Sequence, residues 1–274
     1  MSLEAARTCL QPVLERGRLF CLTGAGVSAE SGIPTFRGSE GFWMVGSRNY
    51  VPEELATWAF FQDHPVDSWD WYRHRFSACR DVTPNPGHLA FVQAEQKLGT
   101  RFFLVTQNVD DLHRRAGNSE AQTAEVHGSI RWMRCMNAAP EAFGGCPDEL
   151  AEIPWDFLLS TSGTDVFEDA RMRCGRCGAW MRPHVLWFDE YYQSSRHYRL
   201  EDALDRLEDA DLLLIAGCSG TLFLANHLVE QVSGRIPMII IDPERHEFVE
   251  KVLRADGVFV QGPGSVALPE LLAF

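Results

Sequence analysis

The sequence predicts an α/β protein built on a parallel, Rossmann-like sheet. Short apolar runs alternate with helix-like segments along most of the chain, and the first of these runs leads directly into a glycine-rich turn. The runs that are typical of buried strands cover residues 18–23, 101–106, 211–216 and 237–241. Because a helical crossover between consecutive strands makes them parallel, the alternation favours a parallel sheet.

Two segments interrupt this alternation. Residues 135–181 are rich in Gly, Pro, Ala and Cys, which indicates a small inserted module, and residues 51–80 form a small helical segment dense in aromatics. We therefore expect one unit spanning residues 1–274, whose Rossmann-like part covers about 1–50, 81–134 and 182–274.

Composition and charge exclude several classes of protein. A chain of 274 residues with 45% hydrophobic content can bury a sizeable core. Its net charge of −13 argues against broad attachment to nucleic acid or to an anionic membrane. No apolar stretch reaches the roughly 20 residues of a spanning helix, and the first 18 residues lack the apolar run of a signal peptide. We expect a cytoplasmic protein with neither nucleic-acid nor membrane partners.

The eight cysteines are predicted to be reduced thiols or metal ligands, since no export signal accompanies them. Four are scattered through the chain, and the default role of each is a small buried hydrophobe: Cys9, Cys21, Cys79 and Cys218.

A phosphate-binding turn follows the first predicted strand. Its residues Gly24, Ala25, Gly26 and Ala29 fit the pattern G-x-G-x-x-(G/A) in a strand-turn-helix setting. A dehydrogenase should continue with a second strand that ends in an acidic residue, but residues 30–38 form a Gly- and Pro-containing loop. The sequence therefore favours a dinucleotide site over hydride transfer.

Polar side chains also follow the second predicted strand. Gln107, Asn108 and Asp110 stand at its carboxyl end, where open α/β sheets place ligands, and His127 lies in the next segment. Helix capping explains one of Asn108 and Asp110 but not the whole set. Taken alone, His127 next to Gly128 is better explained as a buried core histidine.

Together, in this order, the motifs resemble the sirtuin family of NAD-dependent protein deacylases from residue 22 to about residue 242. The matching segments are residues 24–34, 36–37, 106–110, 127–128, 182–185, 187–188 and 217–219.

The resemblance implies that an acyl-lysine oxygen attacks the ribose carbon of NAD that bears nicotinamide, and that lysine and O-acyl-ADP-ribose are released. His127 would be the general base, which suits an imidazole with an ordinary pKa near 6.5. Asn108 would orient the ribose or a water. The implied cofactor residues are Gly24, Ala25, Gly26, Ala29, Phe36, Arg37, Gln107, Asn108, Asp110, Gly217, Cys218, Ser219 and Asp242.

Acylated lysine in a protein is the implied partner, with Val185, Phe188 and Glu190 beside an extended peptide. The chain departs from the family at three positions that bear on ligands: Cys218 replaces the usual Thr, Asp242 the usual Asn, and Asp189 the usual Gly.

Zinc is the second implied ligand. Cys174 and Cys177 form a two-thiolate knuckle, so the inserted module is expected to be zinc-ribbon-like. The family partner is a second close pair, whereas Cys135 and Cys146 are separated by ten residues. We expect a structural zinc on the four cysteines; a module that has lost its metal is the alternative.

The acyl group is expected to be acidic. Tyr72 and Arg75 are three residues apart and would share a helix face. From that spacing alone, the better explanation is an exposed amphipathic helix with Arg75 in solvent and Tyr72 packed at the boundary. A subgroup of sirtuins that removes succinyl and malonyl groups carries this pair, an Ala sixteen residues before the Tyr, and a Thr before Phe-Arg. Here these are Ala56 and Thr35. An NAD hydrolase or ADP-ribosyltransferase on the same groove, and a non-catalytic NAD sensor, are the alternative functions.

Overall fold

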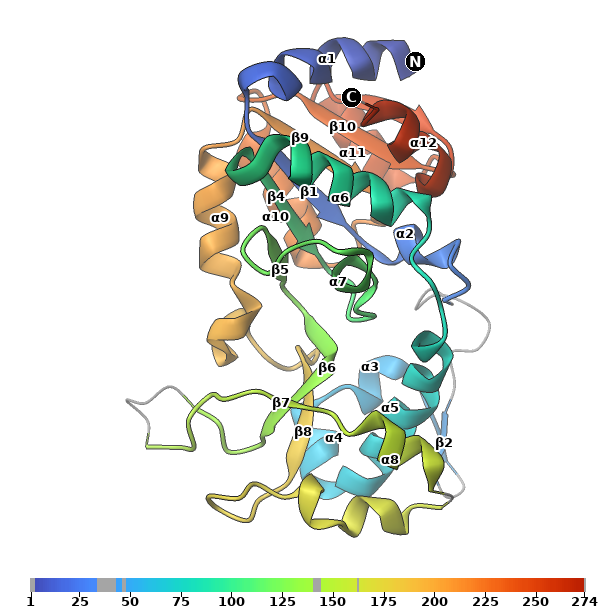
Figure 1. Ribbon diagram of the computed structural model, residues 1–274, viewed down its shortest axis with the longest axis vertical. Helices are drawn as coiled ribbons and strands as arrows, with labels where there is room; N and C mark the ends of the chain where they lie inside the picture. The colour runs from blue at the N-terminus through green and yellow to red at the C-terminus, as the bar shows by residue number, and fades with distance from the viewer. Residues whose placement is uncertain (1–2, 34–42, 46–47, 140–143, 162, 274) are drawn as a thin grey trace.

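The computed structural model describes residues 3–33, 43–45, 48–139, 144–161 and 163–273. The predicted cofactor residues Phe36 and Arg37, and Thr35 before them, lie outside the described residues. Figure 1 shows two parts stacked along the long axis, with a large sheet and its helices above and a smaller mixed part below.

The large sheet has six parallel strands in the order β11-β10-β9-β1-β4-β5. Their bounds are β1 (Leu19–Thr23), β4 (Phe102–Thr106), β5 (Thr123–Glu125), β9 (Leu212–Ala216), β10 (Met238–Asp242) and β11 (Val258–Gln261). The α/β class and the four predicted strands are confirmed, and these four are the interior strands β1, β4, β9 and β10. The sequence analysis did not identify the two edge strands.

Helices cover both faces of the large sheet. Because side chains alternate along a strand, Phe20 and Leu22 point to one face and Leu19 and Cys21 to the other. The first face packs against α9 (Leu200–Glu208), α10 (Phe223–Val232) and α11 (Glu247–Arg254). The second packs against α1 (Leu3–Arg16), α6 (Pro86–Leu98) and α12 (Gly264–Leu271). Among the described residues, no helix is long and apolar enough to cross a membrane.

The lower part combines a three-stranded sheet with short helices (Figure 1). The sheet, in the order β7-β6-β8, contains β6 (Gly128–Cys135), β7 (Ala151–Glu152) and β8 (Met181–Val185). The helices are α3 (Pro52–Leu55), α4 (Trp58–Asp63), α5 (Pro65–Arg80) and α8 (Trp155–Ser160), and β2 (Trp43–Val45) pairs with β3 (Arg48–Tyr50). One shared core, with Trp69 and Phe167 at its centre, joins this sheet to the helices.

Short 3-10 helices connect these elements: η1 (Gly99–Arg101), η3 (Asp165–Glu168), η4 (Ala170–Met172), η5 (Tyr192–Ser194) and η6 (Arg196–Tyr198).

Candidate functional site

The candidate site lies at the point in the large sheet where the order of the strands reverses. β1 lies between β4 and β9. From β1 the chain continues to β4 and β5 on one side, and it later returns to the other side of β1 to form β9, β10 and β11. Thr23 is in register with Thr106 on one side and with Ala216 on the other. The segments after these three residues therefore meet at one carboxyl edge, which is where doubly wound sheets bind ligands.

Three glycines pack against one another at this edge, because α2 (Ala25–Ala29) begins directly over the end of β9. Gly26 N donates to Gly217 O over 3.0 Å, and Gly24 N donates to Ala216 O over 3.1 Å. A Cβ at Gly24 or Gly26 would lie 2.7 Å from backbone atoms of Gly217, whose own φ is +60°. Of the other two turn residues, Ala25 is half-buried and Ala29 exposed. The turn is thus fixed by backbone contacts that a side chain at Gly24, Gly26 or Gly217 would prevent.

Asn108 connects the end of β4 to this turn. Its side-chain amide donates to Gly24 O over 3.0 Å and to Ser28 Oγ over 3.1 Å, so it does more than cap the following helix. Asp110 accepts a hydrogen bond from Leu112 N, the first residue of α7 (Leu112–Ala116), and burial raises the pKa of its carboxyl. Capping therefore accounts for one oxygen of Asp110 and not for Asn108.

Gln107 carries a donor with no internal use. Its Nε2 is buried and has no hydrogen-bond partner among the described residues, while its Oε1 lies 3.8 Å from Cys218 Sγ. A buried donor without a partner is costly, and a bound ligand is one way to satisfy it.

His127 is held in a defined tautomer between β5 and β6. Its Nδ1 donates to Gln107 O over 3.0 Å, because a carbonyl only accepts, and so Nε2 carries the lone pair. Burial lowers the pKa of His127 to about 4, so the ring is a neutral base at pH 7. Gly128 follows with φ +82°, and a Cβ there would lie 1.9 Å from His184 O. The backbone on both sides of the imidazole is therefore fixed.

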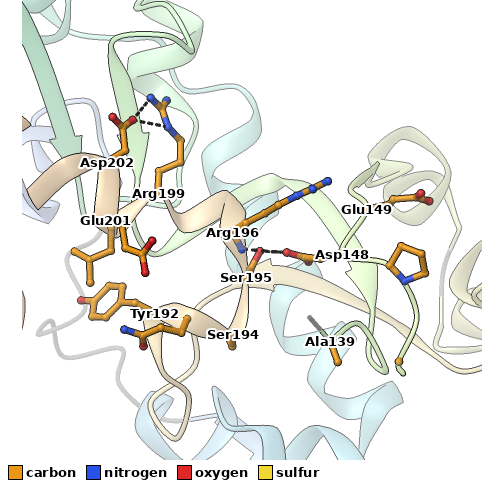
Figure 2. Close-up of a pocket in the computed structure, with 14 residues that line it drawn as sticks. Ala139, Asp148, Glu149, Tyr192, Ser194, Ser195, Arg196, Arg199, Glu201 and Asp202 are labelled. Carbon is orange, nitrogen blue, oxygen red and sulfur yellow. Dashed lines mark hydrogen bonds and ion pairs between the residues drawn. The ribbon is translucent and has the colours of Figure 1, made fainter. Parts of the chain in front are cut away.

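Tyr192 completes the surroundings of His127, and sequence reasoning missed it. Its hydroxyl lies 3.1 Å from Nε2 of His127, and it comes from η5, which belongs to no recognised motif. Tyr192 lines a cavity of about 760 Å³ that lies between residues 192–202 on one side and Ala139 and residues 145–149 on the other. Figure 2 shows Tyr192 among the residues that line it. Burial raises the pKa of Tyr192 to about 12, so its hydroxyl keeps its proton and donates it to the imidazole.

The remaining residues predicted to bind the cofactor follow β9 and β10. Cys218 is buried, and burial raises the pKa of its thiol. Ser219 is exposed, with its Oγ 2.9 Å from Thr221 Oγ1. Asp242 ends β10; it accepts from Glu244 N and lies 3.4 Å from His246 Nε2. These groups lie along the same carboxyl edge as the glycine turn.

The residues predicted to select the acyl group lie in the lower part. Ala56 and Tyr72 are buried and Arg75 is half-buried, which contradicts an exposed helix with Arg75 in solvent. The Tyr72 hydroxyl accepts a hydrogen bond from Trp187 Nε1 over 2.7 Å. The Arg75 guanidinium lies 5.5 Å from the Trp71 ring centroid, and desolvation lowers its pKa.

The segment predicted to bind the peptide begins at the end of β8. Val185 is buried and pairs with Gly128 between β8 and β6, whereas Phe188 is 52% exposed. Glu190 forms an ion pair with the buried Arg182 and accepts a hydrogen bond from Trp187 N, so its carboxylate has an internal structural role.

The four cysteines of the small module converge. Cys135 Sγ lies 3.6 Å from Cys177 Sγ, Cys146 Sγ lies 3.9 Å from Cys174 Sγ, and all four sulfurs lie within 4.8 Å of one another. Thiolates placed about 2.3 Å from a tetrahedral zinc have sulfur–sulfur separations of about 3.8 Å. Cys146 reaches the cluster because its backbone pairs with Asn137 and Ala139. The geometry fits a structural zinc, and with four thiolates no position is left for a reaction.

Comparison with known proteins agrees with this architecture. A family model described as the Sir2 family matches residues 24–223. An NAD-dependent protein deacylase of Leptospira interrogans is 35% identical over 93% of this chain and 92% of its own. The mitochondrial NAD-dependent protein deacylase sirtuin-5 of Canis lupus familiaris is 37% identical over 92% of this chain and 80% of its own.

Solved structures give the same result. The crystal structure of a Sir2 homolog–NAD complex superposes with a TM-score of 0.74 and 32% identity, covering 99% of this chain and 93% of that one. A complex of Sir2 homologues with 2'-O-acetyl ADP ribose gives a TM-score of 0.73 and 33% identity, covering 97% of this chain and 94% of that one. With its glycine turn, its Gln107–Asp110 segment and its histidine in place, this chain belongs to the Sir2 family.

Proposed function

We propose that this Sir2-family chain, an NAD-dependent protein deacylase, prefers lysines that carry an acidic acyl group such as succinyl or malonyl. The observation that carries the proposal is the pairing of Tyr72 with Arg75 on one face of α5. Tyr72 is buried and Arg75 is half-buried. Tyr72 shares with Ala56 a core that consists mainly of apolar side chains.

An acidic acyl group matches this pocket chemically. A guanidinium can bind a carboxylate through two parallel hydrogen bonds, and partial burial strengthens that interaction. The Tyr72 hydroxyl accepts from Trp187 Nε1 and therefore keeps its own proton available for the same carboxylate. Because Ala56 has the smallest side chain compatible with an ordinary backbone, it leaves room for a chain longer than acetyl.

The upper site supplies the chemistry of the transfer. NAD, when bound, provides a ribose carbon from which nicotinamide leaves. His127 is neutral, with its Nε2 lone pair available to take a proton from a ribose hydroxyl once Tyr192 yields its place. The unpartnered Gln107 Nε2 and the amide of Asn108 line the same edge and orient the ribose. The expected products are lysine, nicotinamide and O-acyl-ADP-ribose.

The test is nicotinamide release from NAD in the presence of succinyl-lysine, acetyl-lysine or unacylated peptides of one sequence. We expect release to depend on an acylated peptide, with a higher kcat/KM for succinyl-lysine. A charge-assisted hydrogen bond of roughly 1.5 to 3 kcal/mol corresponds to about ten- to 150-fold in preference. Equal or better use of acetyl-lysine contradicts the acidic preference. Release without any peptide indicates an NAD hydrolase or ADP-ribosyltransferase instead.

A further inference from the structure

Asp189 links the segment 187–190 to the start of α4. Its Oδ1 accepts from Trp58 N over 2.7 Å, and its Oδ2 accepts from Ala59 N over 3.1 Å. The helix's own N-cap, Thr57, accepts the next donor, Phe60 N, over 3.1 Å. The first backbone N–H groups of a helix have no hydrogen-bond partners within it. The Asp189 carboxylate therefore accepts the hydrogen bonds of Trp58 N and Ala59 N, which the Thr57 side chain does not.

The backbone beside Asp189 is fixed to the same region. Phe188 N donates to Ala56 O over 3.0 Å, two residues before the helix begins. Phe188 and Asp189 together therefore hold Ala56, Trp58 and Ala59 through three hydrogen bonds. Ala56 is buried and Phe188 is largely exposed, so these bonds run from the surface segment to a residue of the proposed acyl site.

Trp187, two residues before Asp189, contacts a second residue of the proposed acyl site. Trp187 donates its indole N–H to the Tyr72 hydroxyl, and its ring packs 5.1 Å from the ring of Phe61 on α4. The Arg182 guanidinium lies 3.3 Å from the Trp187 ring centroid and also pairs with Glu190. Thus the segment touches two of the three residues predicted to select the acyl chain, Ala56 and Tyr72.

Direct recognition of a charged peptide residue is a poorer explanation of Asp189. Both of its oxygens already accept backbone N–H groups at hydrogen-bond distance. A lysine or arginine of the peptide would have to compete with these bonds. Its two contacts instead set the separation between the peptide segment and the pocket.

We infer that Asp189 is a positioning residue that couples the peptide-binding segment to the acyl pocket, so that acyl selectivity depends on it. This inference rests on the proposed function for the identity of the two surfaces. It also explains what Asp contributes at a position where glycine, which has no side chain to accept these bonds, is usual in the family.

The experiment compares the unmodified protein with Asp189→Gly and Asp189→Asn. Glycine removes both acceptors; asparagine keeps one oxygen but turns an amide N–H₂ toward the second donor. For Asp189→Gly we expect KM for a succinyl-lysine peptide to rise at least about tenfold, as for the loss of one charge-assisted bond, with kcat within about threefold. The succinyl-to-acetyl ratio should fall, KM for NAD should not change, and Asp189→Asn should be intermediate.

Asp169→Gly is the matched control. Asp169 likewise caps a helix, accepting from Arg171 N over 2.9 Å at the start of η4, but it lies in the cysteine-containing module. It should change neither peptide KM nor the acyl ratio. Equilibrium binding of fluorescent succinyl-lysine and acetyl-lysine peptides provides a readout that does not depend on turnover.

The results separate this inference from the proposed function. Unchanged peptide KM, peptide affinity and acyl ratio in Asp189→Gly overturn it. A uniform fall in kcat for all peptides, with a lowered Tm in both Asp189 variants, assigns the residue to stability alone and also overturns it. If the unmodified protein binds acyl-lysine peptides without turning them over, the proposed function fails while peptide affinity still tests Asp189.

Discussion

The hydroxyl of Tyr192 lies 3.1 Å from Nε2 of His127. The other ring nitrogen, Nδ1, is hydrogen-bonded to the backbone carbonyl of Gln107. A hydroxyl that donates to the Nε2 lone pair stabilises the neutral imidazole, because a protonated Nε2 would present a second hydrogen to it. Burial keeps this base neutral, and we expect the hydrogen bond from Tyr192, a neighbour that no motif identifies, to add to that effect.

Replacing Tyr192 with Phe should raise the pKa of His127 from its lowered value of about 4. A hydrogen bond with a net contribution of about 0.5 to 1.5 kcal/mol corresponds to a rise of up to about one pH unit. NMR titration of the His127 ring protons in the unliganded protein measures it. An unchanged or lower pKa would show that the hydroxyl does not stabilise the neutral ring.

His127→Ala should abolish peptide deacylation while NAD still binds. Loss of a general base removes a factor on the order of 100 to 10,000 in rate, whereas the glycine turn and Gln107 that face the cofactor are untouched. Single-turnover assays with succinyl-lysine peptide measure the first effect and calorimetric titration with NAD the second. Turnover close to that of the unmodified protein would mean that another group takes the proton.

Arg75→Met should remove the preference for acidic acyl groups and spare residual deacetylation. The substitution keeps an apolar side chain of similar length next to Trp71 but removes the positive charge that we propose binds a terminal carboxylate. Arg73→Met is the control, since Arg73 lies on the same helix as Arg75 but donates to Gly163 O over 2.7 Å, with its guanidinium 5.0 Å from the Phe167 ring centroid. A succinyl-to-acetyl ratio of kcat/KM that falls equally in both variants would exclude a specific role for Arg75.

The purified protein should contain about one zinc per chain, and Cys174→Ser should lower its Tm. Structural zinc contributes folding free energy, so removing one of four thiolates weakens both metal binding and the module. Cys9→Ser is the control, because Cys9 lies on α1 in the other part of the molecule. Elemental analysis that finds no zinc in folded, active protein would reject the metal site.

Stability should decrease as the pH falls from about 6.5 toward 4. Burial lowers the pKa of His88 to about 4 and of His184 to about 2, and it lowers that of His113 as well. Between the folded values and the ordinary 6.5 the unfolded chain binds more protons, so each such histidine costs about 1.4 kcal/mol per pH unit as acid is added.

Buried carboxyl groups oppose this trend, among them Asp110 and Asp111, because burial raises the pKa of each. Burial raises the pKa of Glu125 to about 8, so its contribution to stability is lost as the pH rises from 4.5 to 8. Urea denaturation at pH 7, 6 and 5 measures the balance, and His88→Gln should reduce the slope below pH 6.5. A urea midpoint that is constant or rises toward pH 5 would contradict the assignment of neutral, buried histidines.

The sequence predicts the interior of the large sheet and misses its edges for a physical reason. The strands β1, β4, β9 and β10 are buried along their whole length and are therefore continuous apolar runs. β5 has only three residues, and β11 has only two buried residues, between a partly exposed Val258 and an exposed Gln261. Neither gives a periodic signal long enough to separate it from a loop.

The site divides in a similar way. The glycine turn and the Gln107–Asp110 segment can be predicted because each is a local pattern after a strand. The approach of Cys146 to Cys135 depends on backbone pairing with Asn137 and Ala139, which ten intervening residues do not encode as a spacing. Tyr192 reaches His127 from 65 residues away, and a lone tyrosine in a turn carries no local signal.

The contact of Gly24 and Gly26 with Gly217 limits how this protein can be redesigned. Since the backbone of α2 lies against the backbone after β9, an engineer who wishes to alter cofactor preference cannot add a side chain at any of these three positions without separating the two segments. Selection for a modified dinucleotide must instead act through Cys218 and Asp242, whose side chains stand at the same edge. These two residues are predicted to border the adenosine end of the cofactor, and because Cys218 is packed in the core of the large sheet, replacements there have to keep its small size.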